Sequence, residues 1–179
     1  MRRLVCGVFP ALVAGLAMAG VALAGDRITP IDAPGFRADL AAREGKVVLV
    51  NFWATWCRPC LEEIPALMEL ERQLGEQGFE LVAVSLDDPV GSEALLEPFL
   101  DKWFPDFTTF LSMENDMDAM VSVIDPYWNE VLPTSYVVGR DGSMAERIQG
   151  GSTAQEFSAI IRRLLDREAA EDALDSGPM

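Results

Sequence analysis

Two cysteines separated by two residues are the part of this sequence with the clearest capacity for chemistry. Cys57 and Cys60 enclose Arg58 and Pro59 where an apolar run gives way to a helical pattern. At a helix start, unpaired amide donors and the helix dipole stabilise a thiolate, and a second thiol one turn later lies within disulfide reach. The pair therefore indicates a redox-active dithiol, with Cys57 as the exposed, reactive thiol and Cys60 as the shielded one.

The composition restricts the other chemistries that this pair could support. The chain contains no histidine, and its one further cysteine, Cys6, lies in the apolar N-terminal run. A four-ligand zinc site, a Ser-His or Cys-His nucleophile pair and covalent haem attachment are therefore excluded. A purely structural disulfide over two intervening residues would remove little conformational entropy from the unfolded chain.

A copper(I) site formed by the same two thiolates remains the alternative hypothesis. Met113, Met117 and Met120 recur at helical spacing and could add thioether ligands to it. The same spacing is typical of the inward face of a short helix, where methionine packs well, and we favour that interpretation. The redox interpretation requires neither a metal nor an organic cofactor.

The charge of the chain narrows the classes of partner. Asp and Glu together number 29 against 14 for Lys and Arg, which gives a formal net charge of -15. Phosphate backbones repel such a surface, so nucleic-acid binding is excluded. Half of the 179 residues are apolar, which suffices for the core of one ordinary domain.

The N-terminal residues 1–24 have the pattern of a secretory signal peptide. Two arginines precede an uncharged run that ends in the small-x-small sequence Ala22-Leu23-Ala24, so we expect cleavage before Gly25. An uncleaved N-terminal membrane anchor is the alternative, but the many alanines and glycines make the run weakly hydrophobic. Both interpretations place the working domain outside the cytoplasm, in the periplasm, with a net charge of -17 after removal of residues 1–24.

Three consecutive patterns predict the unit that positions the dithiol. Residues 47–54 form a near-continuous apolar run rich in β-branched residues, which is typical of a strand buried on both faces of a sheet. Residues 58–74 carry leucine and isoleucine at helical spacing, and residues 79–86 form a second buried strand. Strand, helix and strand of these lengths predict a right-handed βαβ unit.

The rest of the chain predicts a single domain, residues 25–167, with an acidic, disordered tail at 168–179. Within residues 25–45 we expect one short edge strand near Phe36. A capping box at Thr153 and Glu156 begins the last helix. The remaining predicted elements are a helix at 92–103, a strand at 107–111, a helical turn at 114–124 and a hairpin of strands 134–138 and 144–149.

Residues 51–60, followed by Glu63 and Pro65, resemble the active-site segment of the thioredoxin superfamily, most closely the TlpA/ResA/DsbE-like extracytoplasmic thiol-disulfide oxidoreductases. Leu132-Pro133-Thr134 resembles the cis-proline loop of that family, and the likeness covers about residues 36–165. It implies an α/β thioredoxin fold, a central mixed sheet flanked by helices with a central insertion before the cis-proline strand. It also implies a Cys57–Cys60 disulfide, a cis Leu132–Pro133 bond and Pro133 facing the dithiol.

The resemblance implies a role for each residue of the site. Cys57 attacks the partner disulfide, Cys60 resolves the mixed disulfide, and Pro133 shapes the groove that receives the partner chain. Asn51 stands where cytosolic thioredoxins carry a buried aspartate, so the proton acceptor for Cys60 must lie elsewhere. Glu63, three residues after Cys60 on the same helical face, is the candidate, with an exposed charge as its alternative.

The surroundings of the dithiol include Trp56, Arg58 and Pro59, with Trp56 exposed and Trp53 in the core beneath. Tyr127 and Trp128, just before the Pro133 loop, are interpreted either as a docking surface or as scaffold packing. The segment 112–130 has no function that the sequence reveals.

The sequence thus predicts a monomeric, periplasmic thiol-disulfide oxidoreductase that reduces protein disulfides in exported partners, such as apocytochrome c or copper-site proteins, and receives electrons from an upstream membrane donor. A peroxiredoxin-type peroxidase is disfavoured because no Pro-x-x-x-Thr-x-x-Cys pattern precedes Cys57.

Overall fold

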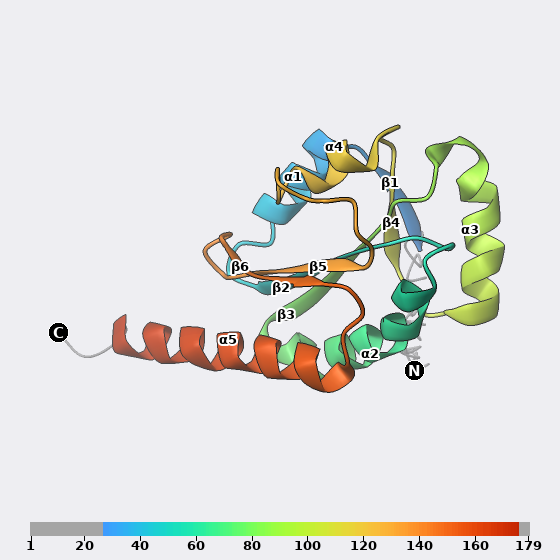
Figure 1. Ribbon diagram of the computed structural model, residues 1–179. Coiled ribbons are helices and arrows are strands. Elements are labelled where there is room, and N and C mark those ends of the chain that lie inside the picture. The colour runs from blue at the N-terminus through green and yellow to red at the C-terminus, as the bar shows by residue number, and fades with distance from the viewer. Residues whose placement is uncertain (1–26, 176–179) are drawn as a thin grey trace, which may run out of the picture.

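A six-stranded mixed sheet organises residues 27–175, the residues that this computed structural model describes (Figure 1). The strands that run side by side are, in order, β1 (Ile28–Ile31), β4 (Thr109–Ser112), β3 (Phe79–Ser85), β2 (Val47–Trp53), β5 (Thr134–Val138) and β6 (Met144–Gln149). The first four pair in parallel, β5 pairs antiparallel with β2, and β6 pairs antiparallel with β5. The α/β class and the mixed sheet are therefore as predicted.

The predicted βαβ unit forms the centre of this sheet. β2 is buried along its whole length, helix α2 spans Arg58–Leu74, and β3 pairs in parallel with β2 from Val47 and Phe79 onward. The bounds of α2 are those that the helical spacing predicts. Because α2 begins directly beyond the carboxyl end of β2, its first turn lies at one end of the sheet.

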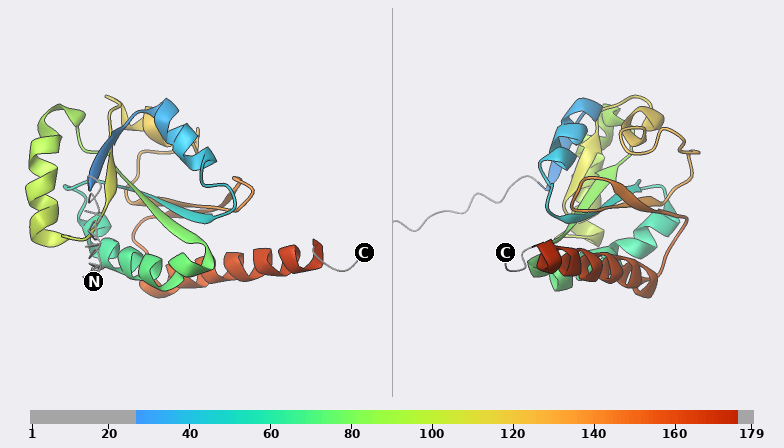
Figure 2. Two further views of the ribbon diagram at one scale, coloured as in Figure 1. Left: turned by 180° about the vertical axis from the view of Figure 1, so that it is seen from behind. Right: turned by 90° about the vertical axis from the view of Figure 1, so that its left-hand side faces the viewer.

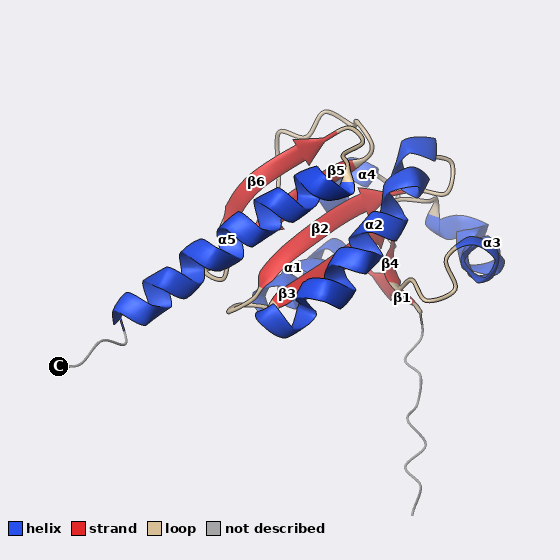
Figure 3. Ribbon diagram, turned by 90° about the horizontal axis from the view of Figure 1, so that it is seen from below, coloured by secondary structure: helices blue, strands red, loops and turns tan. Residues whose placement is uncertain are grey.

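Helices cover both faces of the sheet in two layers (Figures 1 and 3). Alternate residues of β2 point to opposite faces, as in any strand. Val48, Val50 and Phe52 pack with α1 (Ala33–Ala41) and α4 (Met117–Val121). Val47 and Leu49 pack with α2 and α5 (Ala154–Asp175) on the other face.

A third apolar cluster lies beneath the start of α2. It joins Trp53 and both cysteines to Leu96 and Leu100 of helix α3 (Pro89–Trp103). The helix is kinked at Gly91, whose φ of +88° is in the left-handed region, so its regular part begins near the predicted start at residue 92. Figure 2 shows α3 beside the edge of the sheet that β1 and β4 form.

Two segments differ from the sequence prediction near the N-terminus. The sequence predicts a short edge strand near Phe36, but the edge strand is β1 and Phe36 lies in α1. Asp32 caps this helix by accepting a hydrogen bond from the Gly35 amide at 2.8 Å, and Pro34 stands in its first turn, where a proline is tolerated. Pro34 and Gly35 thus begin a helix here, although in the sequence they look like breakers.

The C-terminal helix α5 begins as predicted, because the Thr153 hydroxyl accepts from the Glu156 amide and the Glu156 carboxylate accepts from the Thr153 amide. It continues to Asp175, so the structure contradicts the predicted disordered tail up to that residue. Residues 168–175 are rich in alanine and acidic residues, most of which favour helix. Its last turns project beyond the sheet (Figure 1).

The predicted signal peptide or anchor, residues 1–24, lies outside the described residues. Within residues 27–175, no helix is both long and apolar enough to cross a membrane.

Candidate redox site

Cys57 and Cys60 form a disulfide at the junction of β2 and α2, with their Cα atoms 5.3 Å apart. Cys57 is the N-cap residue of α2, and its amide donates to the Ala54 carbonyl at 3.0 Å. Cys57 keeps 5% of its surface exposed, whereas Cys60, in the first turn of the helix, is fully buried. The disulfide is as predicted, and the difference in exposure is in the predicted direction.

Arg58 is compensated by a neighbouring acid on the surface of α2. Its Nε lies 3.0 Å from Oε1 of Glu62, and the two side chains are 89% and 66% exposed. Water screens such a pair strongly, so Arg58 exerts little net field on Cys57. Trp56, immediately before Cys57, is exposed, and Trp53 is fully buried beneath the dithiol; both placements are as predicted.

Glu63 is buried on the same face of α2 as Cys60 and Ile64, unlike its exposed neighbour Glu62. Its Oε1 accepts a hydrogen bond from Asn51 Nδ2 at 2.8 Å, and its Oε2 accepts one from the Ser152 amide at 3.4 Å. Burial disfavours the charged form and raises the pKa of Glu63 to about 7, although the two hydrogen bonds act in the opposite direction. A carboxyl with that pKa can exchange protons near neutral pH.

Asn51 of β2 links Glu63 to the neighbouring strand. Its amide nitrogen also donates to Ser135 Oγ of β5 at 3.0 Å, so both of its N–H groups are used. Its Oδ1 is buried and accepts no hydrogen bond from the part of the chain that the structure describes.

The Leu132–Pro133 peptide bond is cis, as predicted. Leu132 packs against the cluster that contains both cysteines, and the Pro133 carbonyl accepts from the Gly150 amide at 2.9 Å. The Pro133 loop is therefore fixed to the hairpin on one side and lies beside the apolar surroundings of the dithiol on the other.

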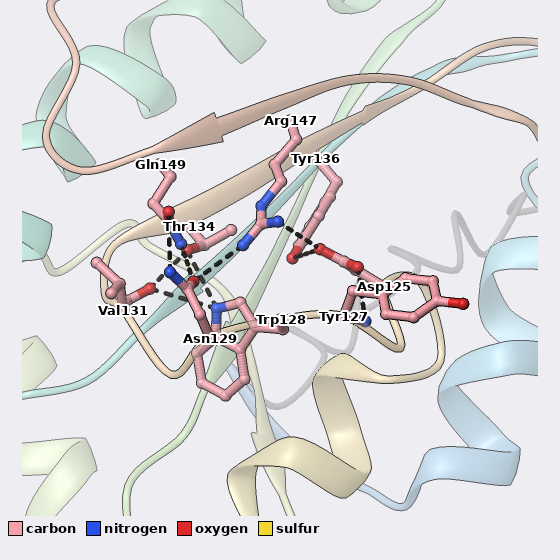
Figure 4. A network of polar contacts seen from close by, with 9 residues as sticks. All are labelled: Asp125, Tyr127, Trp128, Asn129, Val131, Thr134, Tyr136, Arg147 and Gln149. Atoms are coloured by element: carbon pink, nitrogen blue, oxygen red, sulfur yellow. Dashed lines mark hydrogen bonds and ion pairs between the residues drawn. The ribbon is translucent and has the colours of Figure 1, made fainter.

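A polar network fixes the segment that leads into this loop (Figure 4). Buried Asp125 accepts from the Tyr136 hydroxyl at 2.9 Å and forms an ion pair with Arg147 at 3.2 Å. Burial and the neighbouring Asp125 hold the pKa of Tyr136 well above its usual range, so Tyr136 is a hydrogen-bond donor at neutral pH. Asn129 accepts from the same Arg147 at 3.0 Å.

The two aromatic residues of this segment have different surroundings. Trp128 is buried, and its Nε1 lies 3.2 Å from Thr134 Oγ1 and 3.3 Å from the Val131 carbonyl oxygen. Tyr127 is 87% exposed. Scaffold packing therefore accounts for Trp128, and Tyr127 alone presents its ring to solvent.

The three methionines do not converge on the dithiol. Met120 is fully buried in the core on the α1 and α4 face of the sheet, Met117 packs against it, and Met113 is 46% exposed. This supports the packing interpretation for Met117 and Met120. Among residues 27–175 no group of three or more cysteine, aspartate or glutamate side chains is placed to hold a metal ion.

One buried carboxylate near the site is absent from the sequence prediction. Asp87, which follows β3, accepts from the Thr55 hydroxyl at 2.7 Å and from the Ser85 hydroxyl at 2.7 Å. The sequence feature that could have pointed to Asp87 is the pair Asp87-Asp88 after a buried strand. Only Asp88 acts as the N-cap of α3, which leaves Asp87 without a capping role. Thr55 and Asp87 are 32 positions apart, so the sequence gives no local sign of their contact.

Comparisons with known proteins agree with this geometry. A model described as the AhpC/TSA family matches residues 27–147. The thiol-disulfide oxidoreductase ResA of Oceanobacillus iheyensis is 34% identical over 129 residues, which are 72% of this chain and 62% of that protein. ResA of Halalkalibacterium halodurans is also 34% identical and is covered to 71% of its length by 73% of this chain.

A solved structure shows the same fold. The thiol:disulfide interchange protein of the thioredoxin family from Chlorobium tepidum superposes with a TM-score of 0.58 at 23% identity, over 70% of this chain and 83% of that one. With the Cys57–Cys60 disulfide at the start of α2, these findings show that the chain belongs to the AhpC/TSA family and is a thioredoxin-fold, ResA-like thiol-disulfide oxidoreductase.

Proposed function

We propose that this protein works outside the cytoplasm, in the periplasm, as a reductant of disulfides in exported proteins. The observation that carries the proposal is the arrangement of the dithiol. One sulfur-bearing residue at the helix start reaches the surface, and the second is buried on the same helical face as a carboxyl whose pKa is about 7.

Each reaction cycle transfers two electrons from the reduced dithiol to the partner. The Cys57 thiolate attacks one sulfur of the partner disulfide, which forms a mixed disulfide and releases the other partner sulfur as a thiolate that takes up a proton. The Cys60 thiolate then attacks the Cys57 sulfur, which closes the Cys57–Cys60 disulfide and releases the second partner thiol. The partner gains two electrons and two protons, and the protein loses them.

Glu63 and Pro133 support these two steps. Ionised Glu63 accepts the proton of the Cys60 thiol, because it lies on the same buried face of α2 and its pKa suits proton exchange near neutral pH. Pro133 shapes the groove in which the extended segment of the partner lies beside Cys57. The placement of the Leu132 side chain beside the dithiol cluster supports the role of Pro133.

The partners that this chemistry fits are exported proteins whose cysteines must be reduced, such as apocytochrome c or copper-site proteins. Because each cycle leaves the protein oxidised, we propose that a membrane donor upstream returns two electrons to the dithiol. The protein acts as a monomer, either after cleavage of the signal or tethered by its N-terminal segment.

Trapping of the intermediate tests the proposal directly. In a Cys60→Ser variant expressed in the native host, we expect mixed disulfides to accumulate on Cys57, because no second thiol can release the partner. Mass spectrometry after non-reducing electrophoresis identifies the captured proteins. The matched Cys57→Ser variant should capture few of them, and equal capture by both variants would show that Cys60 can also attack.

The direction of electron flow is tested by the reduction potential. We expect a value near that of thioredoxin, about -270 mV, and far below that of the oxidant DsbA, about -120 mV. Pro59 resembles the thioredoxin pattern, and the acidic surroundings disfavour the Cys57 thiolate, while Arg58 is exposed and paired with Glu62. Equilibration with glutathione buffers measures the potential, and a value above about -170 mV would make the protein a disulfide donor.

A further inference from the structure

A buried carboxylate tied to the turn before Cys57 has no place in the reaction as described so far. Asp87 is 5% exposed and lies in the loop between β3 and α3. Its two carboxylate oxygens lie 3.2 Å and 3.1 Å from the Thr55 amide nitrogen, and Oδ1 also accepts from the Thr55 hydroxyl. The carboxylate therefore contacts the chain two residues before Cys57.

The hydrogen bonds of Asp87 indicate that it is ionised. The carboxylate oxygens accept from the amide and hydroxyl of Thr55 and from the hydroxyl of Ser85 at 2.7 Å. An ionised carboxylate accepts at both oxygens, and the Thr55 amide, which can only donate, faces both oxygens of Asp87. No Lys or Arg ion pair to Asp87 is found among the described residues, so its negative charge is balanced by these dipoles alone.

This arrangement joins the ends of two neighbouring strands at the redox centre. Thr55 follows β2, Ser85 ends β3, and the Leu86 amide also donates to the Trp53 carbonyl at 2.8 Å. Asp87 thus joins the carboxyl ends of β2 and β3 at the turn that precedes α2. A buried charge there is screened by water much less than the exposed Arg58–Glu62 pair.

We propose that Asp87 is a positioning residue of the redox centre that holds the Thr55–Cys57 turn and whose buried charge disfavours the Cys57 thiolate, which keeps the dithiol reducing. The inference rests on the proposed function and names a residue that helps to set the reduction potential of the dithiol. Less thiolate means a less stable reduced form, so the dithiol gives up its electrons more readily. In residues 54–64, in the β3–α3 loop 86–88 and in the loop 126–133 the charged residues are Arg58, Glu62, Glu63, Asp87, Asp88 and Glu130.

An Asp87→Asn variant removes the charge and can keep the geometry. The asparagine Oδ1 can accept from both Thr55 donors, and its Nδ2 can donate to Ser85, whose hydroxyl has acceptor capacity to spare. We expect the equilibrium constant with glutathione to move about tenfold toward the reduced protein, which corresponds to about 30 mV. The Cys57 pKa, measured from the pH dependence of alkylation rate, should fall in the same variant.

Two further variants separate charge from geometry. Asp88→Asn removes an exposed charge at the neighbouring position and keeps a capping side chain, so the potential and the Cys57 pKa should stay at the wild-type values. Thr55→Val removes the hydroxyl donor and keeps the Asp87 charge, which is then less compensated, so the Cys57 pKa should rise. If Thr55→Val lowers the Cys57 pKa, a loosened turn and not the charge sets it, and the inference is overturned.

The outcomes also distinguish this inference from the proposed function. Wild-type protein that fails to exchange with glutathione would contradict the proposed function itself. Wild-type protein that exchanges normally, with Asp87→Asn indistinguishable from Asp88→Asn, would contradict only the role of Asp87. If Asp87→Asn is not recovered folded, as judged by circular dichroism, the direction of the Thr55→Val shift decides.

Discussion

Replacement of Glu63 with glutamine should slow the resolving step of disulfide reduction by about 10²- to 10⁴-fold at pH 8, the usual contribution of a positioned general base. Glutamine keeps the size of the side chain and can still accept from Asn51, but it cannot take the proton of Cys60. The Cys60 thiol would then lose its proton only to water or buffer. That proton loss is slow, because the buried position of Cys60 disfavours the thiolate.

The pKa of Glu63 fixes the direction in which the reduction rate changes with pH. Burial raises the pKa of Glu63 to about 7, and the basic form is the ionised one, so the wild-type rate should rise as the pH increases through about 7. The glutamine variant should lack that inflection.

The raised pKa of Glu63 also means that the folded protein binds more protons than the unfolded chain between about pH 4.5 and 7. The free energy of unfolding should therefore fall across that range by about 3 kcal/mol in the wild type and not in the variant.

Single-turnover stopped-flow fluorescence measures the step, with a disulfide peptide as substrate and the exposed Trp56 beside the dithiol as reporter. Glu62→Gln, which alters an exposed carboxylate at the adjacent position, is the control and should change the rate by less than a factor of about two. A Glu63→Gln protein that keeps the wild-type rate and inflection would remove Glu63 from the mechanism.

Truncation of Phe36 to alanine should lower the free energy of unfolding by about 3–5 kcal/mol, the range observed for large-to-small changes of fully buried aromatic residues. Phe36 is the buried residue of α1, and its ring packs edge-on against Phe52 at a centroid distance of 5.9 Å. The cavity would open on the face of the sheet opposite α2. The reduction potential should therefore stay at the wild-type value.

Urea denaturation of the oxidised protein, followed by tryptophan fluorescence, measures this change. Arg37→Ala in the same helix alters an exposed side chain and should stay within about 0.5 kcal/mol of the wild type. A loss below 1 kcal/mol for Phe36→Ala would mean that α1 contributes little to the core, and a shifted potential would mean that the two faces are coupled.

The sequence predicts the elements around the dithiol well because their signals are local. The apolar run of β2 and the leucine spacing of α2 are repeated over several residues, so one misleading position does not change the interpretation. α1 is different, since it has nine residues and a low content of helix signals, and its start depends on the cap formed by Asp32. Pro34 and Gly35 in its first turn are residues that occur more often in turns, so the local sequence gives little sign of this helix.

The residues of the site likewise fall into those that the local sequence reveals and those that it does not. The cysteines and Pro133 belong to contiguous motifs, so the sequence locates them. Asp87 and Thr55, in contrast, meet only after β2 and β3 are paired, and nothing in either local sequence points to the other. The contact of Tyr136 with Asp125 likewise depends on a loop that folds back over β5 and β6. Such contacts are products of the tertiary fold and require it to be known.

The two edge strands described above bear on how a protein of this kind meets unfolded chains. An open strand edge is a ready template on which a further extended chain can pair and aggregate. Pro30 in β1 supplies no backbone N–H, and β6 carries the charged residues Glu146 and Arg147. Both borders of the sheet are therefore poor templates, which favours release of an extended partner after thiol exchange over its retention as an added strand.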